Sequence, residues 1–159
     1  LPHGGELLGP EHVRDVVTAL GPTRLGHGVR ASEDPALLDS VVAAGISLEV
    51  CPTSNVCLGV YRTAEDVPLA TLLEHGAQVA LSADDPLLFQ SRLTDQYEIA
   101  RRLGLSDTAL AELARGSIRA CLASPASKRR WLAEIDAWLA GPVDHQENQE
   151  TVVPVSSGS

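Results

Sequence analysis

The first 86 positions alternate between short apolar runs and segments with helical spacing. The runs cover residues 23–26, 46–50 and 79–81, and each follows a break that contains glycine. Each run also ends at residues that are typical of turns. Short runs bounded in this way are typical of buried strands, so we predict one strand in each.

The intervening segments carry apolar residues at helical spacing. One stripe follows the i, i+3, i+4, i+7 rule and consists of Val13, Val16, Val17 and Leu20. Two more, at 37–42 and 69–73, begin at or after a proline and end before a glycine, as helices do. Strands and helices in alternation predict βαβ units and a parallel sheet. The pattern alone fits both a (β/α)₈ barrel and a doubly wound sheet.

After Pro86 the pattern is helical throughout. Stripes at 93–103, 110–118 and 131–139 predict three helices, with Ser106 able to cap the second and Ser124-Pro125 separating the last two. Residues 142–159 are polar and proline-broken, and we predict that they form a disordered tail. The expected folded domain is therefore 1–141.

Composition narrows the function classes. The chain is 44% hydrophobic with a formal net charge of −9, so it can form a packed core and is unsuited to a nucleic-acid partner, which needs clustered Lys and Arg. The basic run Lys128-Arg129-Arg130 is explained by the solvated start of a helix. Three cysteines without Cys-x-x-Cys spacing argue against disulfides and favour a cytoplasmic protein. No apolar stretch is long enough for a membrane span.

Candidate chemistry gathers at the ends of the predicted strands, at His3, Glu6, His27, Asp84 and Asp85. The carboxyl ends of parallel strands are where active sites form in α/β folds. Imidazoles and carboxylates together suit a divalent metal, which would also offset two adjacent aspartates. Structural explanations remain for each residue alone: Asp85 could cap a helix, and His27 could be a turn residue.

Four segments in this order resemble the adenosine deaminase family. They are Leu1-Pro2-His3-Gly4-Gly5-Glu6, Arg24-Leu25-Gly26-His27-Gly28, Leu48-Glu49-Val50-Cys51-Pro52-Thr53-Ser54-Asn55 and Leu81-Ser82-Ala83-Asp84-Asp85-Pro86. They resemble the family's segments after barrel strands five to eight. The resemblance implies the C-terminal portion of a (β/α)₈ TIM-type barrel, followed by C-terminal helices.

The resemblance also implies roles. His3 and Asp84 are expected to be zinc ligands, and Glu6 to donate a proton to purine N1 and then handle protons for the departing amine. His27 is expected to orient and stabilise the zinc-bound hydroxide.

The implied substrate is a small purine nucleoside. Asp85, near purine N7, and Gly5 are expected to contact it, and the implied reaction is zinc-dependent hydrolysis of adenosine or 2′-deoxyadenosine to inosine and ammonia. Deamination of adenine or another 6-aminopurine remains an alternative.

One family feature has no counterpart in the sequence, which contains no His-x-His. In the family this pair supplies two further zinc ligands from the N-terminal barrel half. That half is therefore an expected partner. We expect the chain by itself to self-associate and to retain zinc weakly, and an inactive truncated fragment is the alternative from another class.

Overall fold

The computed structural model describes residues 1–141, in which four short strands form one parallel sheet. The strands are β1 (His3–Gly4), β2 (Arg24–His27), β3 (Ser47–Val50) and β4 (Val79–Leu81). They lie in the order β1-β2-β3-β4. A doubly wound sheet reverses its strand order at a switch point, whereas a barrel adds each strand beside the preceding one. The observed order is that of a barrel segment.

Helices connect and follow the strands. Between the strands lie α1 (Pro10–Leu20), the 3₁₀ helix η1 (Val29–Glu33), α2 (Pro35–Ala43), α3 (Pro52–Cys57), the 3₁₀ helix η2 (Ala64–Asp66) and α4 (Leu69–Glu74). After β4 come α5 (Pro86–Phe89), α6 (Leu93–Arg102), α7 (Asp107–Ala120) and α8 (Pro125–Ala140). Several of these helices have proline in the first turn, where its missing N–H leaves no hydrogen bond unmade.

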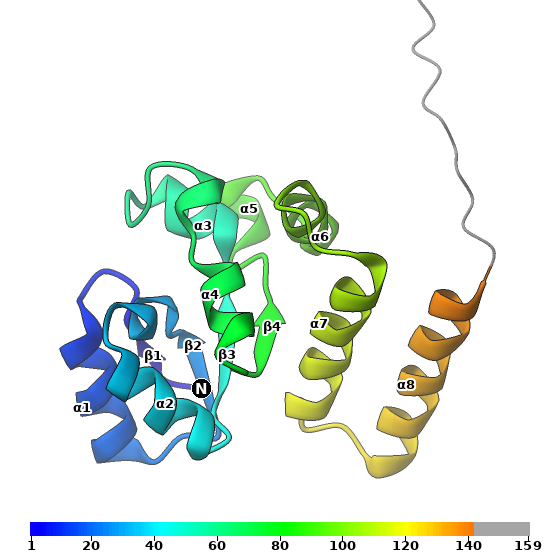
Figure 1. Ribbon diagram of the computed structural model, residues 1–159, viewed down its shortest axis with the longest axis horizontal. Coiled ribbons are helices and arrows are strands. Elements are labelled where there is room, and N and C mark those ends of the chain that lie inside the picture. The colour runs from blue at the N-terminus through cyan, green and yellow to red at the C-terminus, as the bar shows by residue number, and fades with distance from the viewer. Residues whose placement is uncertain (142–159) are drawn as a thin grey trace, which may run out of the picture.

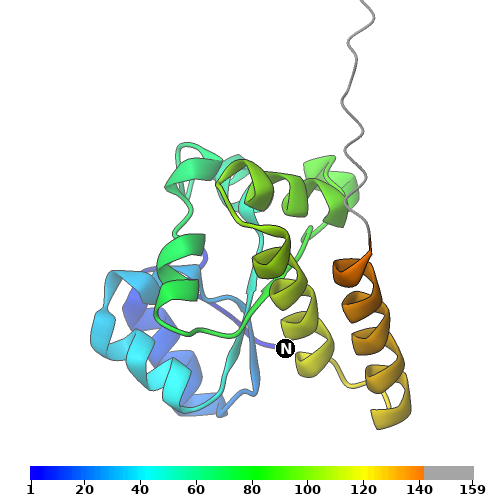
Figure 2. The ribbon, with the colours of Figure 1, turned by 45° about the vertical axis from the view of Figure 1, so that its right-hand side comes forward.

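The helices lie along the sheet from its β1 edge to its β4 edge (Figure 1). α1 and α2 lie beside β1 and β2, whereas α7 packs against β4 at the other end. Figure 2 shows α8 alongside α7, with α7 between it and the strands. The two helices are joined by an ion pair between Arg115 and Asp136, whose Nη2 and Oδ1 atoms are 2.6 Å apart.

The core lies between the strands and the helices that cover them. Leu25 of β2 and Leu48 of β3 are fully buried, together with Val13 of α1, Leu38 of α2 and Leu72 of α4. Burial of an aliphatic side chain of this size contributes about 1.5–3 kcal/mol. The helical stripes in the sequence therefore define the faces that hold the sheet.

Most predicted elements are confirmed. The three predicted strands and the predicted helices are present with ends within a few residues, and Ser106 caps α7 by accepting a hydrogen bond from Ala109 N. The first strand lies at His3–Gly4, two residues beyond the stub expected at its start. The short helix α3 was not predicted, and α5 was offered only as the helix that Asp85 could cap, because neither is long enough to show helical periodicity.

Three other expectations concern membranes and the C-terminal part of the chain. Within residues 1–141, no helix combines the length and apolar character needed to cross a bilayer. The basic run Lys128-Arg129-Arg130 lies in the first turns of α8, as expected. The predicted tail, 142–159, falls outside the described residues.

Candidate functional site

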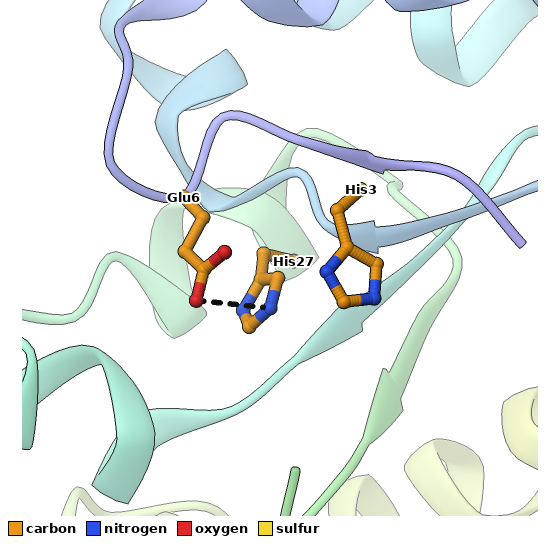
Figure 3. A group of neighbouring side chains, drawn as sticks. All are labelled: His3, Glu6 and His27. Atoms are coloured by element: carbon orange, nitrogen blue, oxygen red, sulfur yellow. Dashed lines mark ion pairs between the residues drawn. The ribbon is translucent and has the colours of Figure 1, made fainter.

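The candidate residues lie at one end of the sheet, where the strands finish. His3 is in β1 and His27 is the last residue of β2, while Glu6 and Asp84 lie in the turns after β1 and β4. Figure 3 shows the side chains of His3, Glu6 and His27 side by side, with the Glu6 carboxylate facing the His27 ring. Parallel pairing thus brings together residues that are far apart in the sequence.

An unusual backbone conformation sets the direction of two of these side chains. His27 and Asp84 have φ values of 60° and 59°, in the left-handed region that residues other than glycine rarely adopt. Such conformations cost on the order of 1–3 kcal/mol and tend to gather at functional sites. Gly28 follows His27 with φ 66°, which glycine adopts without strain. The strand therefore ends sharply and turns the imidazole toward the site.

His27 is the centre of the group. Its Nε2 atom lies 3.4 Å from Glu6 Oε1 and 3.8 Å from Asp84 Oδ2. The His3 and His27 rings meet edge to face, with centroids 5.1 Å apart. One imidazole is therefore in reach of two carboxylates and a second imidazole.

Burial controls the charge of His27, whose side chain is 3% exposed. Burial lowers the pKa of His27 below its usual value, while the nearby carboxylates of Glu6 and Asp84 oppose this shift. The neutral imidazole is therefore favoured, the form that binds metals and accepts protons. Its Nδ1 atom is buried and has no hydrogen-bond partner among residues 1–141.

The two aspartates have different surroundings. Asp84 Oδ2 accepts a 2.6 Å hydrogen bond from Ser54 Oγ, and Asp84 N donates to Ser82 Oγ at 3.2 Å. Asp85 caps α5, since its Oδ1 accepts from the backbone N–H groups of Leu87 and Leu88. The capping explanation for Asp85 is therefore correct, and it leaves Oδ2 outside the cap.

The donor atoms suit a divalent metal ion. One ligand atom each from His3, Glu6 and His27 lie within 4.8 Å of one another, and so do atoms from His27, Cys51 and Asp84. Ligands of a single zinc ion are no more than about 4.4 Å apart, since Zn–N and Zn–O distances are about 2.0–2.2 Å. The nitrogen and oxygen donors are of the kind such an ion takes, and the unpartnered Nδ1 of His27 is a further candidate donor.

Cys51 is the least suited of these donors. Burial raises the pKa of its thiol to about 12, and the Asp84 carboxylate adds to the shift. Thiols bind metals as thiolates, so nitrogen and oxygen atoms are the better donors here.

These features match a known family. A sequence model described as adenosine deaminase matches residues 1–138. The chain belongs to the adenosine deaminase family. The match covers both the strands that carry the site and the helices after them, so the expected TIM-type barrel fold is confirmed.

Individual relatives of this deaminase family agree. A Streptomyces virginiae protein named as an adenosine/adenine deaminase is 58% identical over 141 residues, which cover 88% of this chain and 42% of the relative. An aminodeoxyfutalosine deaminase from Streptomyces avermitilis is 42% identical, with 88% of this chain and 40% of the relative covered. The crystal structure of adenine deaminase from Arthrobacter aurescens has a TM-score of 0.83 at 34% identity, covering 87% of this chain and 43% of that one.

The chain thus spans about two fifths of the length of these deaminases. His27 joins two groups of donor atoms, one with His3 and Glu6 and one with Cys51 and Asp84. Gly5 adjoins them in a left-handed turn, with φ 63°.

Two polar features escaped the sequence reasoning. Arg24 of β2 forms an ion pair with Glu49 of β3, so a charged pair lies between adjacent strands that lead to the site. Buried Gln96 of α6 accepts hydrogen bonds from Thr53 N and Oγ1 and donates to Ser91 Oγ. The ion pair could have been found from the sequence, because a charged residue inside a predicted strand is a signal for such a pair. The hydrogen bonds of Gln96 join segments far apart in the sequence and leave no local signal.

Proposed function

We propose that this chain forms part of a zinc-dependent hydrolytic deaminase that converts adenosine or 2′-deoxyadenosine to inosine and ammonia. The observation that carries the proposal is the grouping of His3, Glu6 and Asp84 around His27 at the carboxyl ends of parallel strands. This set offers metal ligands and a proton donor around one imidazole, as a hydrolytic reaction requires.

His3 and Asp84 are the proposed zinc ligands. When bound, zinc lowers the pKa of a coordinated water from 15.7 to about 7, which supplies a nucleophile at neutral pH. Asp84 is held for this role by the hydroxyl of Ser54, because a hydrogen-bonded ligand keeps its orientation.

Glu6 is the proposed proton carrier. Purine N1 gains a proton from the Glu6 carboxyl while water oxygen adds to C6, so that the ring accepts the electron pair. The resulting tetrahedral carbon carries both the hydroxyl and the amino group. The attacking oxygen gives up two protons, of which one restores the Glu6 carboxyl and the other passes to the amine. Ammonia then leaves as the C6–N bond breaks, and C6 becomes the carbonyl of inosine.

The remaining proposed roles belong to His27, Asp85 and Gly5. A neutral His27 accepts a hydrogen bond from the attacking water and keeps it in line with C6, a role that agrees with its lowered pKa. Asp85 Oδ2 is proposed to bind the purine near N7, and Gly5 to contact the ring through its backbone.

Two alternatives to this proposal remain, one in the substrate and one in the class of function. The relatives are named for adenosine or adenine and for aminodeoxyfutalosine, so adenine or another 6-aminopurine is the alternative substrate. An inactive fragment is the alternative of another class.

The test joins this chain to the N-terminal part of the Streptomyces virginiae relative and loads the chimera with zinc. Adenosine, 2′-deoxyadenosine and adenine are then compared by loss of substrate and release of ammonia. We expect turnover that Glu6→Gln abolishes and that His75→Ala, at an exposed histidine of the α4 end, leaves unchanged. A folded, zinc-loaded chimera that deaminates none of these purines would favour the inactive fragment.

A further inference from the structure

The pairing of β1 with β2 sets His3 opposite Gly26 and Gly4 opposite His27. Residues opposite one another on neighbouring strands project to the same face of the sheet, about 4.8 Å apart. Gly26 has no side chain, so the space above it on the His3 face is open to the imidazole.

The imidazole of His3 fills that space. A Cβ atom built on Gly26 would lie 2.4 Å from His3 Cδ2 and 3.0 Å from His3 Nε2. These distances are well inside van der Waals contact, so a methyl group and the ring cannot both be there.

Backbone conformation does not explain this glycine. Gly26 is absent from the left-handed glycines of the described chain, which include its neighbour Gly28. Alanine could therefore adopt the Gly26 backbone conformation, and the ring of His3 is what it would displace.

We propose that Gly26 is a positioning residue, whose missing side chain forms the seat of the His3 imidazole. The seat holds the His3 ring edge-on to His27, at the centroid distance of 5.1 Å. It thereby keeps a His3 nitrogen in reach of the donor atoms of Glu6 and His27. The metal-binding part of this inference rests on the proposed function.

Two other glycines provide matched controls. A Cβ atom on Gly9 would meet only Arg30 Nη2, at 3.9 Å, and Gly9 has φ −68°. A Cβ atom on Gly116 of α7 would lie 2.7 Å from the carbonyl oxygen of Val79 in β4. Gly116 thus reports on helix packing, whereas Gly9 reports on the addition of a methyl group to open space.

The experiment compares Gly26→Ala, Gly9→Ala and Gly116→Ala in the 159-residue chain. Three quantities are measured: the Tm, the zinc affinity by competition with a chromophoric chelator, and the His3 ring NMR signals of the metal-free protein. For Gly26→Ala we expect a Tm close to wild type, shifted His3 signals and a zinc affinity at least about tenfold lower. Gly9→Ala should leave the zinc affinity and the His3 signals unchanged and lower the Tm only slightly, because Gly9 is the N-cap of α1. Gly116→Ala should lower only the Tm.

Either of two results would overturn the proposal. One is unchanged His3 signals in Gly26→Ala. The other is a loss of Tm, or of folding, as large as in Gly116→Ala, because Gly26 would then serve packing. If the wild-type chain binds no zinc by itself, the zinc affinities are compared in the chimera with the N-terminal barrel half, and the His3 signals of the metal-free protein decide the role of Gly26.

Discussion

The hydroxyl of Ser54 donates a 2.6 Å hydrogen bond to Oδ2 of Asp84, linking the first turn of α3 to the turn after β4. Ser54 is 1% exposed, whereas the Asp84 side chain is 25% exposed and its backbone is in a left-handed conformation. A buried, fixed donor thus orients a partly exposed carboxylate. Residues that orient a ligand in this way typically affect metal affinity about 10- to 100-fold.

Ser54→Ala removes this donor and is expected to weaken zinc binding by about 10- to 100-fold, because Asp84 loses its fixed orientation. The cost in stability should be about 1 kcal/mol, the value of one hydrogen bond. Competition with a chromophoric chelator measures the first quantity and urea unfolding the second. Ser40→Ala is the control, since Ser40 Oγ donates only to Ala36 O on the exposed side of α2. Equal zinc affinities for the two variants would contradict the role given to Ser54.

The fold was largely readable from the sequence, for a physical reason. Strands of a parallel sheet are covered by helices and consist of continuous apolar runs, so Val79–Leu81 and its counterparts could be located directly. Strand order could not be read in this way, because βαβ units fit two architectures; the family resemblance was needed. Short helices such as α5, at four residues, span too little sequence for periodicity.

The site residues at the strand ends could be predicted from the sequence, but the residues that hydrogen-bond to them from other segments could not. His27 directly follows one predicted strand and Asp84 lies in the turn after another, and the parallel sheet brings such positions to one end. The hydrogen bond from Ser54 to Asp84 spans 30 positions, and the one from Thr53 N to Gln96 spans 43. Such links depend on the packing of segments that local patterns treat separately.

Gln96→Leu is expected to destabilise the chain by about 2–4 kcal/mol. The Gln96 side chain is fully buried and joins Thr53 of α3 to Ser91 before α6. Leucine would leave these buried partners unsatisfied, at about 1–3 kcal/mol for each group. Urea unfolding gives the difference in the free energy of unfolding. The control is Glu98→Leu, at an exposed position of the same helix, whose free energy of unfolding should stay within about 0.5 kcal/mol of wild type. Similar losses of stability in both variants would refute the role of the Gln96 hydrogen bonds.

Zinc is expected to raise the Tm of the chain reversibly. A ligand that binds only the folded state adds about 2.7 kcal/mol at 100 times its Kd, and a mild chelator should remove this increment. His3→Ala and Asp84→Asn should each reduce the zinc-dependent shift, because each deletes a proposed ligand. His75→Ala should retain it, since His75 is exposed and its Nδ1 atom lies 2.9 Å from Thr71 O of its own helix. A shift of full size in His3→Ala would place the zinc elsewhere.

The cysteines should differ in their reaction with iodoacetamide at pH 8. Cys57 is exposed, whereas Cys51 is 4% exposed and burial raises the pKa of its thiol to about 12. The thiolate is the reactive form. At pH 8, well below a pKa of about 12, Cys51 is almost entirely in the protonated form, so both access and ionisation slow its reaction. Peptide mapping by mass spectrometry should find Cys57 alkylated first and Cys51 last, with half-buried Cys121 between them.

Cys57→Ser should remove the fast phase of this reaction alone. Unfolding in urea should bring all three rates together, and a fast Cys51 in the folded chain would mean that β3 and the start of α3 open readily to solvent.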